Sequence, residues 1–394
     1  MHILFVTAEY PPAPGGLGAY TATLGQALTD AGCRVSILTG QATAPHNTPL
    51  PVYAEIPRWG WRIGRTVAQR AQDLGATWVH VQYQTGAYAM HPAINLAPWA
   101  WARTQPRPFC IAWTYHDLLP PYLFPKAGRR LRNWVTHFPA RYADLTIVTN
   151  EGDRLTLAQR ARNLAKIPIG SNIAGSEATP AERQQRRAYR GFDEHDLVIG
   201  YFGFLNRSKG GLALVRTLKL LVEAGRRAHL LMIGERVGEN DPTNYAYLRE
   251  VESAIEQLGL TGRVRWTGRQ PDEGVSADLH ACDLLLMPYE DGASLRRGTL
   301  MAGLAHGCAI ITTQPHDPLP EFVDGRDLLY VPPGDAPAMA AAVMQIADDP
   351  ALAQQLRAQA TSISRHFAWA PIAQAHLQAY ASLGSLETPP WASM

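Results

Sequence analysis

The sequence predicts two doubly wound α/β domains of the Rossmann-like kind, placed one after the other along the chain. The 394 residues exceed what a single compact core usually holds and suit two domains of ordinary size. Apolar runs of strand length alternate with helical segments in both halves, a pattern typical of parallel sheets covered by helices on both faces. A polar and charged stretch over 171–196 separates the two series and is expected to be a linker.

The composition is that of an ordinary globular protein. Hydrophobic residues make up 46% of the chain, charged residues 18%, and the formal net charge is +2. These values exclude a disordered chain and give no reason to expect nucleic acid as a partner. The four cysteines form no CxxC pair, as expected of reduced thiols in a cytoplasmic protein. No apolar stretch approaches the ~18–20 residues that span a bilayer, and we expect no signal peptide.

The first domain is expected over residues 1–170 and opens with a βαβ unit. Tyr20, Leu24 and Leu28, spaced by four, mark the buried side of the first helix, and Gly32 ends it. The expected elements are strand Ile3–Thr7, loop Pro11–Gly18, helix Ala19–Ala31, strand Arg34–Thr39, and later strands Trp78–Gln82, Phe109–Tyr115, Leu145–Thr149 and Ala165–Ile169.

The second domain is expected over residues 197–366 and repeats the alternation, and a last helical segment occupies 367–394. The expected strands are Leu197–Phe202, His229–Ile233, Val264–Thr267, Asp283–Pro288, Cys308–Thr312 and Leu328–Val331. The expected helices are Gly211–Glu223, Tyr245–Leu258, Thr299–Ala305, Ala336–Ala347, Pro350–Ser364 and Pro371–Leu383. Ligands of such sheets bind at the carboxyl ends of the strands, so the site is expected in a cleft across which the domains face each other.

A glycine-rich loop, Gly15-Gly16-Leu17-Gly18, joins the first strand to the first helix. Glycines let the backbone approach a ligand closely, and a helix N-terminus favours an anion. The loop is a poor dinucleotide fingerprint because Thr21 stands where the third glycine should be, so a nicotinamide dehydrogenase is not indicated. The alternatives are an acceptor- or phosphate-facing loop and a simple tight turn.

A polar pair, His116-Asp117, follows the apolar strand CIAWTY at what should be the carboxyl edge of the first sheet. A histidine there can accept a proton, and an adjacent aspartate can set its tautomer. We therefore predict a catalytic role for the pair, with a surface turn as the alternative.

Two loops of the second domain carry cations beside helix N-termini. Arg207 and Lys209 lie in the glycine-rich loop 203–211, and Arg296 and Arg297 precede Gly298-Thr299 in the next such loop. Glycines, cations and free helix N–H groups together suit a diphosphate. The alternative is that these charges are simply solvated.

Taken together, GGLG, YHD, IPIGSN, GFLNRSKGG and LMAGLAHGCAIITT make the chain similar to the GT-B-fold glycosyltransferases of family four, which are retaining and use nucleotide sugars. The resemblance implies that the last helix, in 367–394, returns to the first domain. It also implies that one set of residues binds the diphosphate of the donor and another binds its sugar and nucleotide. The residues expected to bind the diphosphate are Gly16, Gly18, Arg207, Lys209, Arg296, Arg297, Gly298 and Thr299. Those expected to bind the sugar and nucleotide are Glu235, Glu290, Asp291 and Ser294.

The chain departs from the family pattern in two places. Phe204 stands where the family usually has an arginine that contacts the diphosphate. The family usually has two glutamates with seven residues between them. They should fall near Ser294 and Ala302, and neither position holds a glutamate. Glu290 and Asp291 are the nearby carboxylates that could replace them.

The function expected from the resemblance is transfer of a sugar, with retention, from a nucleotide diphosphate sugar to an acceptor hydroxyl in glycan, polysaccharide or glycoconjugate biosynthesis. The acceptor would be a sugar, a lipid-linked molecule or another small molecule. No Asp-x-Asp motif is present, so we expect no metal and no other cofactor, the cations replacing the metal. The alternatives are a catalytically weakened nucleotide-sugar-binding subunit and a nucleotide-sugar 2-epimerase on the same fold.

A basic and aromatic cluster in the first domain raises the alternative of peripheral contact with the inner face of the membrane. It comprises Lys126, Arg129, Arg130, Arg132 and Arg141 around Trp134 and Phe138. Such a helix can lie on an anionic surface. A solvated helix face explains the same pattern.

Overall fold

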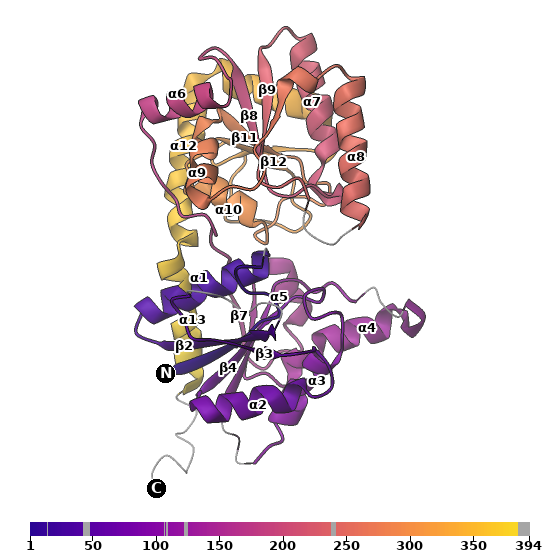
Figure 1. Cartoon of the computed structure of the whole chain (residues 1–394), viewed down its shortest axis with the longest axis vertical. Coiled ribbons are helices and arrows are strands. Elements are labelled where there is room, and N and C mark those ends of the chain that lie inside the picture. Colours follow the sequence, from indigo (N-terminus) through magenta and orange to yellow (C-terminus); the bar gives the residue numbers. More distant parts are fainter. Residues whose placement is uncertain are drawn as a thin grey trace. The chain divides into compact units, whose positions relative to one another are not determined.

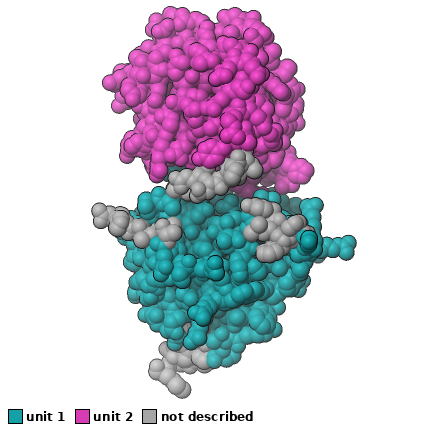
Figure 2. Space-filling model, turned by 45° about the vertical axis from the view of Figure 1, so that its right-hand side comes forward, with its two compact units in different colours: residues 1–172, 368–394 teal, residues 173–367 magenta. Residues whose placement is uncertain are grey.

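The computed structural model describes residues 1–13, 15–41, 48–105, 107, 109–121, 125–237 and 242–384, with the main chain alone at 125, 242–243 and 384. Two compact units make up the chain and are coloured separately in Figure 2. Unit 1 comprises Met1–Asn172 together with Ala368–Met394, and unit 2 comprises Ile173–Phe367. The prediction of two doubly wound α/β domains is confirmed.

Unit 1 contains a seven-stranded parallel sheet in the order β3-β2-β1-β4-β5-β6-β7. The strand order reverses between β1 and β4, which makes their carboxyl ends a topological switch point of the kind that binds ligands. The strands are β1 His2–Val6, β2 Arg34–Gly40, β3 Val52–Ile56, β4 Trp78–Tyr83, β5 Cys110–Tyr115, β6 Leu145–Val148 and β7 Leu164–Lys166.

Helices cover both faces of this sheet. They are α1 Gly16–Asp30, α2 Ile63–Leu74, α3 Ala93–Trp101, α4 Gly128–His137, α5 Glu151–Leu157 and α13 Trp369–Gly384. The last helix lies beside the first one in space, although they come from opposite ends of the chain (Figure 1). In β1, Ile3 and Phe5 pack in the core with α1 and α13, whereas Leu4 and Val6 pack in the core with α2 and α3. This alternation explains why the strand reads as a continuous apolar run.

Unit 2 contains a six-stranded parallel sheet in the order β10-β9-β8-β11-β12-β13. The strands are β8 Leu197–Phe202, β9 Ala228–Ile233, β10 Val264–Trp266, β11 Leu284–Met287, β12 Ile310–Thr313 and β13 Leu329–Val331. The helices are α6 Pro180–Tyr189, α7 Gly211–Glu223, α8 Pro242–Gln257, α9 Asp272–Ala281, α10 Gly298–Ala305, α11 Ala336–Asp348 and α12 Pro350–Ser364. Among the described residues, no helix is both long and apolar enough to cross a membrane.

The segment 171–196 is more than the predicted linker, because most of it belongs to unit 2 and contains α6. Thr179 and Glu182 form a capping box at the start of that helix. The helix packs on α9 through Arg186 and Arg190, both of which bind the fully buried carboxylate of Asp278. A helix that docks through arginines shows no apolar periodicity, which is why the sequence pattern missed it.

Candidate active site

The two predicted cationic loops of unit 2 meet at the carboxyl edge of its sheet. The backbone N–H of Glu290, after β11, donates to the carbonyl of Ser208, after β8, at 2.9 Å. Gly210 has a φ of +69°, and a Cβ at that position would lie 1.8 Å from the carbonyl oxygen of Pro288. Only glycine permits this approach, so the glycine-rich loop serves to bring the two cationic loops together.

Lys209 and Arg297 share the ring of Tyr289. The Lys209 Nζ lies 5.1 Å and the Arg297 Cζ 4.6 Å from the ring centroid, distances at which a cation is attracted to an aromatic face. The Tyr289 hydroxyl is 2.7 Å from the Thr299 hydroxyl in the first turn of α10. We call Lys209, Tyr289, Arg297 and Thr299 the cationic cluster. Lys209, Arg297 and Thr299 were predicted from the sequence, and Tyr289 was not.

The cationic cluster has a deficit of negative charge. Arg297 pairs with Asp291, an exposed carboxylate, and its buried Nε has no hydrogen-bond partner among the described residues. Burial and the charge of Arg297 lower the pKa of Lys209 to about 8, and the opposing effect of Asp291 is smaller. Since two cations share one exposed anion, a further anion between them would be stabilised.

The remaining predicted donor residues are more scattered. Arg207 is exposed and pairs with Glu250 on α8 at 2.9 Å, which directs it away from the cationic cluster. The backbone N–H of Arg296 donates to the Ser294 hydroxyl at 3.3 Å. Glu235 lies 4.0 Å from Arg269, and Glu290 is exposed on the loop surface. Gly298 begins α10.

The glycine loop of unit 1 lies close to a carboxylate that sequence analysis overlooked. A Cβ on Gly15 would come 2.3 Å from the Oε2 of Glu9, and a Cβ on Gly18 would come 3.0 Å from the Glu9–Tyr10 backbone. Gly18 is therefore needed for this close approach to the backbone, whereas the flexible Glu9 side chain could move away from a Cβ on Gly15, and Gly16 has open space around its Cα. Burial raises the pKa of Glu9, whose carboxylate has no hydrogen bond or ion pair with a described residue. The only sequence feature that could have marked Glu9 as a site residue is its position after the first strand, in AEYPP.

His116 follows β5 at the carboxyl edge of the unit 1 sheet and takes part in a buried hydrogen-bond chain. Its Nε2 lies 2.9 Å from the Gln82 Oε1, whose amide nitrogen is 3.3 Å from the Nε2 of His80. The other nitrogen of His80 is 2.6 Å from the hydroxyl of Tyr380 on α13. Sequence analysis pointed to Asp117 as the tautomer-setting group, but Gln82 holds His116, and the Asp117 Oδ1 accepts from the backbone of Leu119.

This chain keeps His116 neutral. Because the Gln82 oxygen only accepts, His116 carries its proton on Nε2 and leaves Nδ1 as an acceptor. Burial lowers the pKa of His116 to about 3, with a smaller contribution from His376, and burial lowers the pKa of His376 to about 4. The ring of Tyr20 packs edge-on against His116 at 4.6 Å. A neutral imidazole of this kind can orient a hydroxyl but is a weak base.

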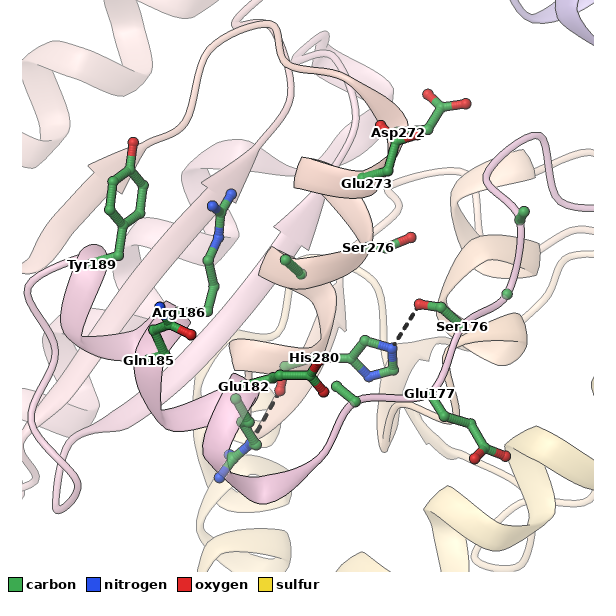
Figure 3. Close-up of a pocket in the computed structure, with 15 residues that line it drawn as sticks. Ser176, Glu177, Glu182, Gln185, Arg186, Tyr189, Asp272, Glu273, Ser276 and His280 are labelled. Carbon is green, nitrogen blue, oxygen red and sulfur yellow. Dashed lines mark hydrogen bonds between the residues drawn. The ribbon is translucent and has the colours of Figure 1, made fainter.

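A large hollow lies elsewhere in unit 2 and includes none of the predicted donor residues. It measures about 600 Å³ and is enclosed by α6, α9 and the segment 174–178 (Figure 3). The Ser176 hydroxyl and the His280 ring, 3.1 Å apart, close one side, and carboxylates such as Glu177 and Glu273 lie on the wall (Figure 3). Arg183 and Arg186, on the same wall, are already bound to Asp283 and Asp278. The hollow therefore offers no unbound cation for a diphosphate.

The described parts of the two units contain no candidate metal site. No group of three or more His, Cys, Asp and Glu side chains there is arranged to hold an ion.

Comparison with known proteins gives a consistent result for both units. Residues 14–172 match the family model described as Glycosyltransferase Family 4, and residues 196–349 match the model described as Glycosyl transferases group 1. The 2-deoxystreptamine glucosyltransferase of Streptomyces kanamyceticus is 26% identical over 227 residues, 56% of this chain and 54% of that protein. The D-inositol 3-phosphate glycosyltransferase of Corynebacterium diphtheriae is 25% identical over 57% of this chain and 52% of that protein. The chain thus matches about half the length of these curated relatives.

Solved structures share the fold over nearly the whole chain. HepE of Anabaena, in complex with UDP and glucose, superposes with a TM-score of 0.74 at 18% identity, covering 97% of this chain and 100% of that one. Sucrose-phosphate synthase of Thermosynechococcus elongatus gives a TM-score of 0.75 at 21% identity, covering 98% and 100%.

Proposed function

The chain belongs to the GT-B glycosyltransferases of family four, and on that premise we propose that it transfers a sugar from a nucleotide diphosphate sugar to an acceptor hydroxyl in glycan or glycoconjugate biosynthesis. The observation that supports this most is the cationic cluster of unit 2. Lys209, Arg297 and the N-terminus of α10 present positive charge at the carboxyl edge of a doubly wound sheet, where a nucleotide diphosphate is expected to bind.

The cationic cluster also suits the leaving group of the reaction. As the bond from the sugar to the diphosphate breaks, negative charge accumulates on the phosphate oxygens. Donors that are already in place stabilise this charge without reorganisation. We infer that these donors make a metal ion unnecessary. We also infer retention of configuration, as the family resemblance implies, with the acceptor hydroxyl held on unit 1 near His116.

We also propose that the protein contacts the membrane surface peripherally, through helix α4 of unit 1 (Figure 1). Leu131 and Trp134 are 51% and 45% exposed on this helix, beside the exposed Arg129 and Arg130. Arg132 instead donates to the carbonyl of Pro121 at 2.8 Å. Co-sedimentation with anionic liposomes at low and high salt tests this contact, and absence of binding at low salt contradicts it.

A non-catalytic binding subunit is the second candidate, because Ser294 and the buried Ala302 occupy the positions of the family glutamates. A thermal-shift screen of nucleotide diphosphate sugars, followed by turnover assays with each binder, separates the two candidates. A ligand at ~100 times its Kd stabilises the folded protein by roughly 2.7 kcal/mol. Transfer or donor hydrolysis supports the enzyme, binding without either supports the subunit, and no binding by any donor contradicts both.

A further inference from the structure

A second hollow lies in unit 1, at the same carboxyl edge of the sheet as His116. It measures about 500 Å³ and is formed by the loop that follows β3 and the turn that follows β4. Its walls are mainly aromatic and basic. The lining side chains that matter here are Arg58, Trp59, Trp61, Arg62 and His91. We call this hollow the tryptophan pocket.

Two tryptophans give the pocket its aromatic surface. Trp61 is 70% exposed, an unusual state for so large an apolar ring, and its ring meets that of His91 edge-on at 5.0 Å. Exposed aromatic faces of this kind stack well on sugar rings, whose C–H groups form apolar patches. His91 accepts a hydrogen bond from the Ala93 backbone through Nδ1 at 3.1 Å. In a neutral ring the proton is then on Nε2, which becomes a donor with no described partner.

Two arginines supply positive charge that the described part of unit 1 does not neutralise. Arg58 and Arg62 are exposed, and neither side chain makes an ion pair or hydrogen bond to a described residue. Arg70 on the following helix contrasts with them, because its guanidinium holds Glu55 at 2.6 Å. A guanidinium fork with no anion favours a phosphate or carboxylate as partner.

The turn beneath the pocket is strained. The N–H of His91 donates to the carbonyl of Tyr88 at 3.1 Å, and the two residues between them, Ala89 and Met90, have φ values of 52° and 56°. Positive φ at both central positions is characteristic of a type I′ turn and normally selects Gly or Asn. Non-glycine residues in this region are strained, and such strain is concentrated at ligand-binding sites.

A chain of contacts through three residues connects the pocket to His116. The ring of Trp59 lies 4.7 Å from that of Tyr88, and the Tyr88 hydroxyl donates to the Gln82 carbonyl at 2.8 Å. The side chain of Gln82 in turn holds His116. The pocket is thus joined, through Trp59, Tyr88 and Gln82, to the residue expected to orient the acceptor hydroxyl.

We propose that the tryptophan pocket binds the acceptor, and that this acceptor is a saccharide bearing a phosphate or carboxylate. Its ring would stack on Trp61, and its anionic group would be held by Arg58, Arg62 and the Nε2 of His91. The inference rests on the proposed function, because it identifies the substrate class on the acceptor side of that reaction.

Calorimetric titration of the full chain tests the inference without any donor sugar. The probes are glucose 6-phosphate and glucuronate, compared with glucose and with inorganic phosphate. We expect at least one anionic sugar to bind at least tenfold more tightly than both comparison compounds. Trp61→Ala, and separately the double variant Arg58→Ser/Arg62→Ser, should weaken its binding at least tenfold. Trp99→Ala is the matched control, since Trp99 is also exposed and paired with an arginine, Arg103, but lies outside the pocket; it should stay within twofold.

Three results overturn the inference: no anionic sugar binds, inorganic phosphate or glucose binds equally well, or the pocket variants behave like the control. UDP is titrated into the same samples to test the donor side separately. Normal UDP binding with any of those three results contradicts the acceptor pocket alone. Failure of UDP and of every nucleotide diphosphate sugar to bind contradicts the proposed function itself.

Discussion

The carboxyl edges of the two sheets have the same topology but opposite chemistry. In unit 2 this edge carries two cations on one tyrosine ring, with Asp291 as their exposed counter-charge. In unit 1 the corresponding edge carries His116 in a chain of neutral groups that continues through Gln82 and His80. The cations on this edge, Arg58 and Arg62, line the tryptophan pocket, which does not include His116. Under the proposed function, the same arrangement of strands and helices would thus hold an anionic leaving group in one unit and orient a neutral hydroxyl at His116 in the other.

Arg297→Ala is expected to have the largest effect, because it removes the bidentate member of the cationic cluster. We predict a loss of about 2–4 kcal/mol in transition-state stabilisation, as for other preorganised charge-stabilising donors. The measurement is kcat/KM with one identified donor. Arg296→Ala, the neighbouring arginine, serves for comparison and should have the smaller effect. A change of only a few-fold in both variants would assign these arginines to the surface.

His116→Ala tests the neutral edge and should lower turnover at least ~100-fold, the scale of a lost orienting or acid–base group. Circular dichroism and the melting temperature establish that the variant is folded. His116→Gln should retain part of the activity, since an amide can still accept a hydrogen bond from a hydroxyl. Near wild-type turnover of His116→Ala would show that the residue only shapes a turn.

The pH dependence of nucleotide binding distinguishes the two edges, because this dependence should come from Lys209 in unit 2 and not from His116 in unit 1. The pKa of Lys209 is about 8 in the free protein, so its charge is lost as the pH rises through that value. Affinity for UDP should therefore fall, by up to ~tenfold per pH unit, above pH 8. In Lys209→Arg the decline should disappear, because arginine keeps its charge. An equal decline in both proteins would exclude Lys209 as its cause.

Acid should destabilise unit 1 through the half-buried His116 and the buried His376, each with a smaller effect than the changes above. The pKa values of His116 and His376 lie at about 3 and 4, below the unfolded value near 6.5, so the unfolded chain binds more protons between these limits. Stability is thus highest above pH 6.5 and is lost towards pH 4, by up to ~1.4 kcal/mol per pH unit for each histidine.

His376→Leu isolates one of these histidines, because the buried Nε2 of His376 has no hydrogen-bond partner among the described residues. The melting temperature of this variant should fall less between pH 7 and pH 5 than that of the wild type. The exposed His366 provides the control, and His366→Leu should leave the pH profile unchanged. Identical profiles for all three proteins would contradict the assignment.

Most of the fold could be predicted from the sequence because its buried strands are continuous apolar runs and its main helices have an apolar face. The helix Gly211–Glu223 and the strand Leu197–Phe202 were predicted with the bounds that the structure gives them. Strand β3 and helices α6 and α9 were missed. Their burial is partial or depends on ion pairs, as with Arg186 and Asp278, so no simple periodicity marks them.

The candidate site was less predictable, because its contacts join residues that are distant in sequence. His116, Lys209 and Arg297 could be proposed from their places after strands. Gln82, the partner of His116, is a buried residue within β4, and Tyr289 ends an apolar run, so both looked like core residues. Arg207 seemed equivalent to Lys209 in the sequence, and only the structure shows its pairing with Glu250 on α8.

Calorimetric titration of UDP into variants of both edges tests the contrast between the two units most directly. Lys209→Ala and Arg297→Ala should each weaken UDP binding at least tenfold, because each removes a cation from the proposed diphosphate site. His116→Ala and Arg207→Ala should stay within twofold of wild type, the first because His116 belongs to a chain of neutral groups in unit 1 and the second because Arg207 is bound to Glu250. Unchanged affinity in both cationic-cluster variants, or an equal loss in His116→Ala, would contradict the division of roles between the two edges.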